Sequence, residues 1–193
     1  EYLEVLAHGG PEIEGIQVKG ILGQDFLTRF NFILDYPSQT INFEENEEYA
    51  RSLSGGVYTL LNSTQRNLVL IPPQSHESRP SLFSLDSGAR GMVLFGSNFN
   101  GLGFDMNSVS DPEPLQTVVG RGFVSHGTFR SFKVGGNTLR NLRVQLAPDS
   151  KLSMYRIENG LLPTNFFQTI YFNNAQKFVA FNPRFENAPR SKE

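Results

Sequence analysis

The chain has 193 residues, a net charge of −2 and no cysteine. It is long enough to bury a core of its own, and its charge gives no electrostatic reason to expect nucleic-acid binding. The lack of cysteine excludes disulfides, a cysteine nucleophile and thiolate metal sites, and no apolar run approaches the roughly 20 residues of a membrane span. We therefore expect neither a nucleic-acid nor a membrane partner.

Short apolar runs bounded by Gly, Pro, Asn and Ser dominate the sequence, and long helical periodicity is scarce. This pattern is typical of an all-β domain. In chain order, we predict strands over residues 15–19, 30–34, 40–43, 57–61, 68–71, 81–85, 93–95, 115–119, 127–134, 142–146, 169–172 and 178–181.

Two segments have the pattern of short helical turns. Residues 25–29 and 165–168 are each predicted to form one or two turns, with Asp25 and Asn165 as the capping residues. The helical content is therefore expected to be small.

The connections carry ordinary turn chemistry. Residues 35–38, with Asp35 as a turn residue, and residues 135–137 favour hairpin turns, because Gly and Asn tolerate positive φ and Pro fixes its own. Residues 44–49 form an acidic connector, and residues 184–193 are polar and expected to be frayed.

The sequence also contains an internal repeat. Residues 20–27 align with residues 160–167, and in the continuation Phe32 falls on Phe172. After a gap of two residues, Phe43 falls on Phe181. Sequence repeats usually mean repeated structure, here with a spacing of about 140 residues.

The repeat predicts a division of the chain. Residues 50–185 would be one complete unit, and residues 186–193 a polar tail. Residues 1–49 would be the C-terminal half of another unit, ending in the acidic connector. The front of that first unit would precede Glu1.

The most informative motif is Asp86-Ser87-Gly88-Ala89, which follows the apolar residues of a predicted strand. It places a carboxylate at a strand end, next to a hydroxyl and a glycine. Taken alone, the tripeptide Asp-Ser-Gly is also a common strand-end turn. A serine nucleophile at Ser87 is excluded, because the chain lacks Gly-x-Ser-x-Gly around it and a placed base.

Further elements follow in order. Residues 118–123 are predicted to form a glycine-containing hairpin centred on Gly120-Arg121-Gly122, and residues 132–139 a strand and turn. Residues 161–163 repeat the apolar-apolar-Gly pattern of residues 21–23, but with Pro163 in place of the glycine. Proline supplies neither the N–H nor the freedom of glycine, which questions the packing beneath the aspartate motif.

Together these elements resemble the retropepsin-like (gag-type) aspartic peptidases, including their bacterial two-repeat relatives. The resemblance implies an all-β, closed β-barrel lobe with short helical turns, plus the C-terminal half of a second homologous lobe. It implies that Asp86 is catalytic and that Ser87, Gly88 and Ala89 support the catalytic pair. The substrate-binding flap would comprise Gly120, Arg121, Gly122 and Phe123.

One aspartate cannot perform this chemistry alone, because the family pairs two carboxylates about 3 Å apart that share one proton. The second would come from a missing N-terminal lobe of the same protein or from a second copy in a homodimer. The resemblance implies a polypeptide substrate and neither cofactor nor metal. The alternative is a catalytically inactive module that binds an extended peptide or a partner strand.

The histidines offer no metal site. His8 and His76 lie in loops rich in Gly or Pro, and His126, just past the flap, is interpreted as a solvated loop residue. No His, Asp or Glu cluster has metal-ligand spacing.

Overall fold

The computed structural model describes residues 12–13, 16–17, 22–45, 47–62, 66–74, 79–96, 104–117, 120–147 and 157–185. Strands dominate these ranges, which confirms the predicted all-β class. The helices are α1 (Gln24–Leu27), α2 (Glu48–Ser52), η1 (Met106–Ser108) and η3 (Thr164–Phe166). None of the helices in the described ranges is long and apolar enough to cross a membrane.

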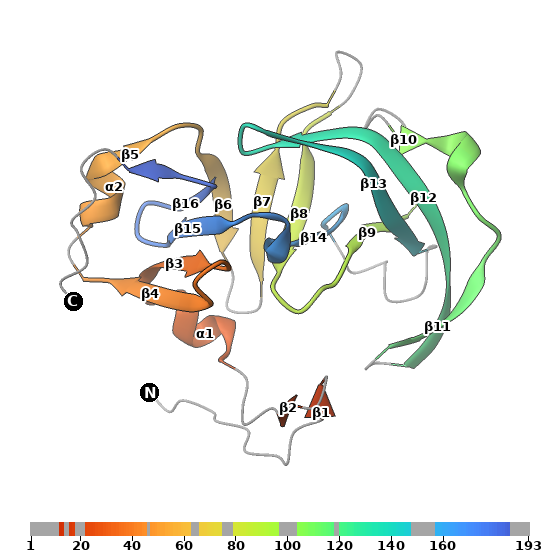
Figure 1. The fold of residues 1–193 in the computed structure, drawn as a ribbon, viewed down its shortest axis with the longest axis horizontal. Coiled ribbons are helices and arrows are strands. Elements are labelled where there is room, and N and C mark those ends of the chain that lie inside the picture. Colours follow the sequence, from red (N-terminus) through yellow and green to blue (C-terminus); the bar gives the residue numbers. More distant parts are fainter. Residues whose placement is uncertain are drawn as a thin grey trace.

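One large sheet runs through the molecule, in the order β10-β12-β13-β9-β14-β8-β7-β6-β16-β15-β3-β4, with β11 paired to β12. Its strands are β3 (Asn31–Asp35), β4 (Thr40–Glu44), β6 (Tyr58–Asn62), β7 (Asn67–Ile71), β8 (Ser81–Asp86), β9 (Met92–Phe95), β10 (Phe104–Asp105), β11 (Glu113–Thr117), β12 (Gly120–Val134), β13 (Asn137–Ala147), β14 (Gly160–Pro163), β15 (Thr169–Asn173) and β16 (Phe178–Phe181). Within the described ranges, no pairing joins β10 to β4 at the two ends of this path. Figure 1 shows the hairpins β3–β4 and β15–β16 on one side and the long, curved β12 and β13 on the other.

Two small sheets complete the described strands. β1 (Glu12–Ile13) pairs with β2 (Ile16–Gln17), and β5 (Leu53–Ser54) pairs with β17 (Arg184–Phe185). The β5–β17 pairing shows that the expectation of a frayed end is wrong for Arg184 and Phe185. The polar tail of residues 186–193 lies outside the described residues.

The larger of two clusters of buried side chains among the described residues extends from the hairpins to the far strands, and the smaller one holds Ile33, Tyr171 and Ala180. The larger cluster includes Phe32 and Phe172, whose rings stack with centroids 4.6 Å apart. It also includes Phe83, Phe129 and Phe132, the first and last of which meet edge to face at 5.8 Å. The abundant phenylalanine of the sequence therefore fills the core.

The two hairpins have the same construction. Each has a four-residue connection, 36–39 in β3–β4 and 174–177 in β15–β16. Ile33 is opposite Asn42 in the first, and Tyr171 is opposite Ala180 in the second, so both strands of one hairpin match the other at an offset of 138 residues.

That offset corrects one detail of the predicted repeat. Phe32 occupies the position of Ile170 and not of Phe172, because the two-residue gap precedes β3 instead of following it. Phe172 is instead the cross-strand partner of Phe32 between β3 and β15.

Both predicted helix caps are wrong. α1 begins after Gly23, which puts Asp25 inside its first turn, and η3 begins after Pro163, which puts Asn165 inside it. Neither Gly23 nor Pro163 caps with a side chain. The helical turns begin one residue earlier than predicted, so the polar side chains lie past the capping position.

The predicted turns are confirmed. The Oδ1 of Asp35 accepts a hydrogen bond from the Ser38 N–H at 3.1 Å. β12 and β13 are joined by Gly135 and Gly136, whose φ values of 60° and 72° suit a two-residue hairpin turn. The acidic connector differs from the expectation, since part of it forms α2 after Glu44 accepts a bond from the Tyr49 N–H at 2.6 Å.

Candidate active site

Strand β8 places Asp86 at its end, in the middle of the large sheet. β7 pairs with β8 in antiparallel orientation on one side, and β14 pairs with it in parallel on the other. Pro163 is the register partner of Asp86, and Leu162 that of Leu85. The Phe83 side chain anchors the strand in the core, whereas Asp86 itself is half-buried.

The backbone that follows β8 turns back to hold one carboxylate oxygen. Oδ1 of Asp86 accepts hydrogen bonds from the N–H of Gly88 at 2.8 Å and of Ala89 at 3.1 Å. The Gly88 N–H thus approaches the carboxylate closely, but a Cβ at this position would lie 3.4 Å from the same oxygen, an ordinary contact, so the approach does not itself require glycine. Among the described residues, no hydrogen bond reaches Oδ2, which leaves this oxygen for a ligand or a second carboxyl group.

The other two motif residues, Ser87 and Ala89, differ in their exposure and in their hydrogen bonds. Ser87 is exposed, and its hydroxyl makes no hydrogen bond to any residue that the structure describes. Ala89 is half-buried, not part of the core beneath the motif, and the bond it gives Asp86 comes from its backbone.

Sequence reasoning missed the strand that flanks Asp86. β14 lies between β8 and β9, and Gly160 permits this, because a Cβ there would lie 2.1 Å from the Val93 carbonyl oxygen. Asn159 joins the strands: its Oδ1 accepts from the Leu82 N–H at 2.8 Å and its carbonyl from the Phe95 N–H at 2.8 Å. The dipeptide Asn159-Gly160 was a turn signal that could have marked the start of this element.

Pro163 fits the position that the sequence left in question. Its φ of −62° lies in the range that the proline ring imposes, and its side chain is buried. β14 ends at this residue and η3 begins after it, so the missing N–H interrupts no further rung of the ladder.

A buried ion pair supports the same region and was also missed. Nη1 of Arg66 contacts both carboxylate oxygens of Glu158, at 2.9 and 3.1 Å, and the Glu158 side chain is fully buried. The pair ties the residue that precedes β7 to the segment that precedes β14. Removing Arg66 would take this cation away from the buried Glu158 carboxylate, which should destabilise the region.

The predicted flap is a hairpin, but its centre is not where we expected it. Gly122 of β12 is opposite Leu115 of β11, and Gly120 is opposite Thr117. Gly120, Arg121 and Gly122 therefore lie within β12 and not at a turn, and residues 118–119 lie outside the described residues. The side chains of residues 115–122 also lie outside the described part.

Phe123 is the exposed aromatic side chain of this hairpin. It is opposite Pro114 and 62% exposed. In Figure 1 the end of β11, the start of β12 and the loop between β8 and β9 all lie toward the lower edge of the described sheet.

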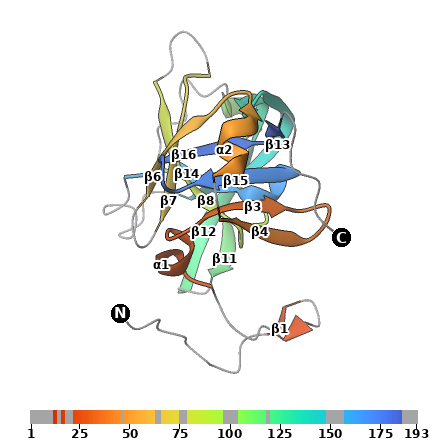
Figure 2. The ribbon, with the colours of Figure 1, turned by 90° about the vertical axis from the view of Figure 1, so that its left-hand side faces the viewer.

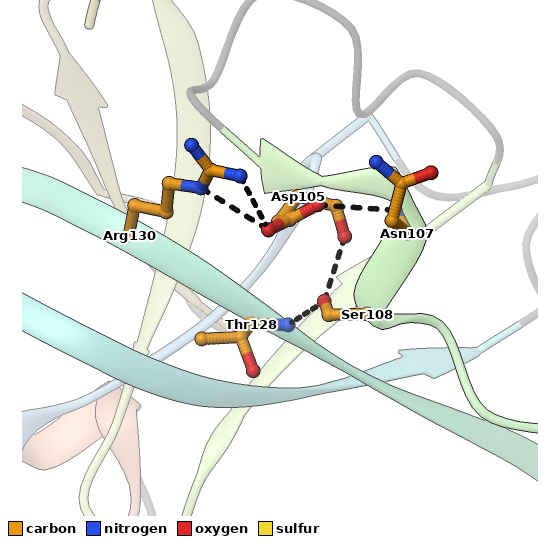
Figure 3. A network of polar contacts seen from close by, with 5 residues as sticks. All are labelled: Asp105, Asn107, Ser108, Thr128 and Arg130. Atoms are coloured by element: carbon orange, nitrogen blue, oxygen red, sulfur yellow. Dashed lines mark hydrogen bonds and ion pairs between the residues drawn. The ribbon is translucent and has the colours of Figure 1, made fainter.

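A polar network fixes the base of the hairpin (Figure 3). Oδ2 of Asp105 accepts from Nε and Nη2 of Arg130 at 3.1 and 3.0 Å, and these bonds hold the pKa of Asp105 below its ordinary value. Oδ1 accepts from the Asn107 N–H at 3.1 Å. The Ser108 hydroxyl donates to the Asp105 carbonyl at 2.6 Å and accepts from the Thr128 N–H at 2.7 Å. The segment before β11 is thereby held against β12.

The interpretation of His126 as a loop residue is wrong. It lies within β12, where its N–H donates to the Ser110 hydroxyl at 2.9 Å, and its Nδ1 is buried without a hydrogen-bond partner in the described ranges. His8 and His76 lie outside the described residues. Within the described ranges, no group of three or more His, Asp or Glu side chains is placed to hold a metal ion.

Comparisons with known proteins agree with this geometry. Residues 75–166, which extend from before β8 through η3, match the family model described as aspartyl protease. A solved retropepsin-like aspartic protease from Rickettsia conorii is 16% identical, with 66% of this chain and 92% of that chain covered and a TM-score of 0.43. No curated protein matches the chain. The resemblance inferred from the sequence is thereby confirmed, and the assignment rests on residues 75–166.

Proposed function

We propose that this chain supplies one half of the active site of an aspartic endopeptidase, with Asp86 as its catalytic carboxylate. The proposal is based on the position and the hydrogen bonds of the Asp86 side chain. Asp86 ends a central strand, its Oδ1 is held by two backbone N–H groups, and it lies within the segment that matches the aspartyl protease family.

The chemistry needs a second carboxyl group facing Asp86. Two carboxyl groups about 3 Å apart cannot both ionise, so they share one proton. The ionised member takes a proton from a water molecule, which attacks the peptide carbonyl, while the protonated member polarises that carbonyl. The Ser87 hydroxyl would hydrogen-bond across the pair, and the reaction needs no covalent enzyme intermediate and no cofactor.

The second aspartate would come from an N-terminal lobe of the same protein. In this division, residues 1–49 are the C-terminal half of that first lobe, residues 50–185 are the complete second lobe and residues 186–193 are a tail. The matching construction of hairpins β3–β4 and β15–β16 supports the division. The competing source is a homodimer that pairs Asp86 with Asp86 across a two-fold axis.

The β11–β12 hairpin would act as the flap over an extended polypeptide substrate. Gly120, Arg121 and Gly122 would offer backbone groups to the peptide, as in strand addition, and Phe123 would contact its side chains. The exposure of Phe123 supports this role.

The test is the variant Asp86→Asn in the natural protein, with any polypeptide that precedes residue 1 included. Cleavage of casein and of a peptide library at acidic to neutral pH should fall to background. The matched control is Asp35→Asn, because Asn173 already occupies the equivalent turn position in the second hairpin. That control should keep full activity.

Three results would decide between the alternatives. A wild-type protein that is as inert as Asp86→Asn and ignores statine-type inhibitors would overturn the peptidase proposal. Peptide binding that survives Asp86→Asn without turnover would favour the inactive binding module. A fully active species that light scattering shows to be monomeric would exclude the homodimer.

A further inference from the structure

Each of the two helical turns is held by the hairpin of the other repeat. The sequence repeat places α1, which begins after Gly23, on η3, which begins after Pro163. The β3–β4 hairpin follows α1 in the chain, and the β15–β16 hairpin follows η3. The turn of each hairpin nevertheless contacts the helical turn of the other repeat, so the contacts are reciprocal.

Tyr36 makes the contact from the first hairpin. It is the first residue of the β3–β4 turn and is half-buried. Its N–H donates to the Gln168 carbonyl at 2.9 Å, and its hydroxyl shares a hydrogen bond with the hydroxyl of Thr164, the first residue of η3. Thr164 is only 2% exposed. The start of η3 is therefore held by a residue 128 positions away in the sequence.

Asn174 makes the corresponding contact from the second hairpin. It is the first residue of the β15–β16 turn and is buried. Its Nδ2 donates to the carbonyls of Leu27 at 3.0 Å and of Phe30 at 2.6 Å, at the end of α1 and just after it. Both hairpins therefore use their first turn residue to hold the helical turn of the other repeat.

A local two-fold axis explains why these contacts are reciprocal. β3 and β15 pair in antiparallel orientation, and in that ladder Ile33 is opposite Tyr171, its own equivalent in the repeat. A rung formed by two equivalent residues lies on a local two-fold axis. Figure 2 shows β16, β15, β3 and β4 in succession down this side of the molecule, with α1 below β4. The axis brings each hairpin beside the other repeat.

The contact of Tyr36 lies one residue away from the register partner of Asp86. Pro163 pairs with Asp86 where β14 and β8 both end, and η3 begins directly after Pro163. Thr164 is therefore the residue that continues the chain from the end of β14. By holding Thr164, the Tyr36 hydroxyl holds the end of β14 and, through the ladder, the end of β8 that carries the carboxylate.

We propose that Tyr36 is a positioning residue for Asp86, and that it acts through Thr164 and the end of β14. The inference rests on the proposed function, because the exact place of Asp86 matters for the reaction only when it shares a proton with a second carboxyl group. It holds for a second carboxyl group from an upstream lobe and for one from a second copy alike, because Tyr36, Thr164 and Asp86 all belong to this chain.

The physical reason is the short distance at which two carboxyl groups share a proton. At about 3 Å the ionisation of one group disfavours that of the other, and a wider separation weakens this coupling. The two apparent pKa values of the pair then lie closer together. A misplacement of catalytic groups by about 1 Å can also lower the rate about a hundredfold. One hydroxyl that fixes the end of β14 is therefore expected to affect kcat.

The test compares Tyr36→Phe with wild type in the natural protein, with any polypeptide that precedes residue 1 included. The change removes the hydroxyl and keeps the ring. We expect kcat to fall about tenfold or more while KM stays within about twofold, because the hydroxyl contacts η3 and not the substrate. The two apparent pKa values in the pH profile of kcat should lie closer together.

The matched control is Tyr49→Phe. Tyr49 lies on α2, and its hydroxyl makes no hydrogen bond to the residues that the structure describes. This variant loses the same atom from the same residue type, and it should leave kcat, KM and the pH profile unchanged.

Variants of Thr164 distinguish positioning from a general loss of stability. Thr164→Val removes the partner hydroxyl and should lower kcat as Tyr36→Phe does. Thr164→Ser keeps a hydroxyl at the same place and should keep the kcat of wild type. In the double variant Tyr36→Phe/Thr164→Val the two losses should not add, because both remove the same hydrogen bond. If Tyr36→Phe does not fold, the comparison of Thr164→Val with Thr164→Ser decides.

Amide proton signals give a second readout, which needs no peptidase activity. The N–H groups of Gly88 and Ala89 donate to Oδ1 of Asp86, so their chemical shifts report the place of this carboxylate. Both signals should change position in Tyr36→Phe and in Thr164→Val, and neither should change in Tyr49→Phe.

The two readouts keep the failure of this inference apart from the failure of the proposed function. An active wild type in which Tyr36→Phe changes neither kcat nor the pH profile would overturn only the role of Tyr36. An inactive wild type in which the Gly88 and Ala89 signals respond to Tyr36→Phe would contradict the proposed function and still show that Tyr36 positions Asp86. An inactive wild type with unchanged signals would overturn both.

Discussion

The hairpins β3–β4 and β15–β16 have the same turn, the same register and opposite surroundings. Residues of β16 are almost all buried, whereas those of β4 are almost all exposed. The turn residues determine the shape of a hairpin locally, but its burial depends on which strands and side chains come to cover it. The stability that equivalent residues contribute should therefore differ widely between the two hairpins.

The largest difference is expected between Phe181→Ala and Phe43→Ala. Phe181 packs against Tyr58 and stacks on Phe167 at 4.3 Å, so its truncation should leave a cavity and lower the free energy of unfolding by about 3–5 kcal/mol. Phe43 is partly exposed, and its truncation should cost about 1–2 kcal/mol in residues 1–193. Urea unfolding of the two variants measures the difference, and equal costs would contradict it.

A smaller effect is expected for Tyr171→Phe, which breaks a polar contact between the hairpins. The buried Tyr171 hydroxyl donates to Oε2 of Glu44 at 2.6 Å and accepts from Nδ2 of Asn173 at 3.1 Å. Its loss leaves both partners short of a bond and should cost about 1–3 kcal/mol. The control is Tyr49→Phe, because the Tyr49 hydroxyl makes no hydrogen bond to the described residues, and thermal unfolding should show it near wild type.

The same tyrosine gives a pH dependence. Burial, and then the hydrogen bond to Glu44, raise the pKa of Tyr171. The folded state therefore favours the neutral phenol of Tyr171. The contribution of this group to the free energy of unfolding is fully present below the ordinary tyrosine pKa of about 10 and falls as the pH rises above it. The decrease in the free energy of unfolding at alkaline pH should be smaller in Tyr171→Phe than in wild type. An unchanged pH profile would contradict this role of Tyr171.

The smallest effect is expected in the turn of the exposed hairpin. Asp35→Ala removes one solvent-exposed hydrogen bond, to the Ser38 N–H, and should cost about 0.5–1 kcal/mol. Asn173→Ala should cost more, because Asn173 is fully buried and also loses its bond to Tyr171. Chemical denaturation of the two variants compares them, and the reverse order would show that burial does not control these turns.

Most strands could be predicted from the sequence, because apolar runs bounded by turn residues report local preference and one-sided burial. The runs at 68–71 and 81–85 correspond to β7 and β8, and the aspartate motif falls at the end of β8. The bond from the Gly88 N–H to Asp86 was also foreseeable, since only a local turn is needed to form it.

The elements that were missed depend on distant partners. β14 contains Gly160 and Pro163, both poor strand residues, and it is a strand because β8 and β9 pair with it on both sides. The ion pair of Arg66 with Glu158 joins residues 92 positions apart, which no local pattern indicates. The tip of the β11–β12 hairpin was misplaced because its glycines lie in a strand instead of at the turn.

The position of β14 also affects the order in which the sheet can assemble. β14 lies between β8 and β9 in the sheet, but it comes much later than both of them in the sequence. The pairing of Gly160 with Phe83 closes a loop of 77 residues, whose entropy must be lost before the contact stabilises anything. We therefore expect this part of the chain to fold slowly for its size, and a nascent chain on the ribosome should complete the strand that pairs beside Asp86 only after residue 163 has emerged.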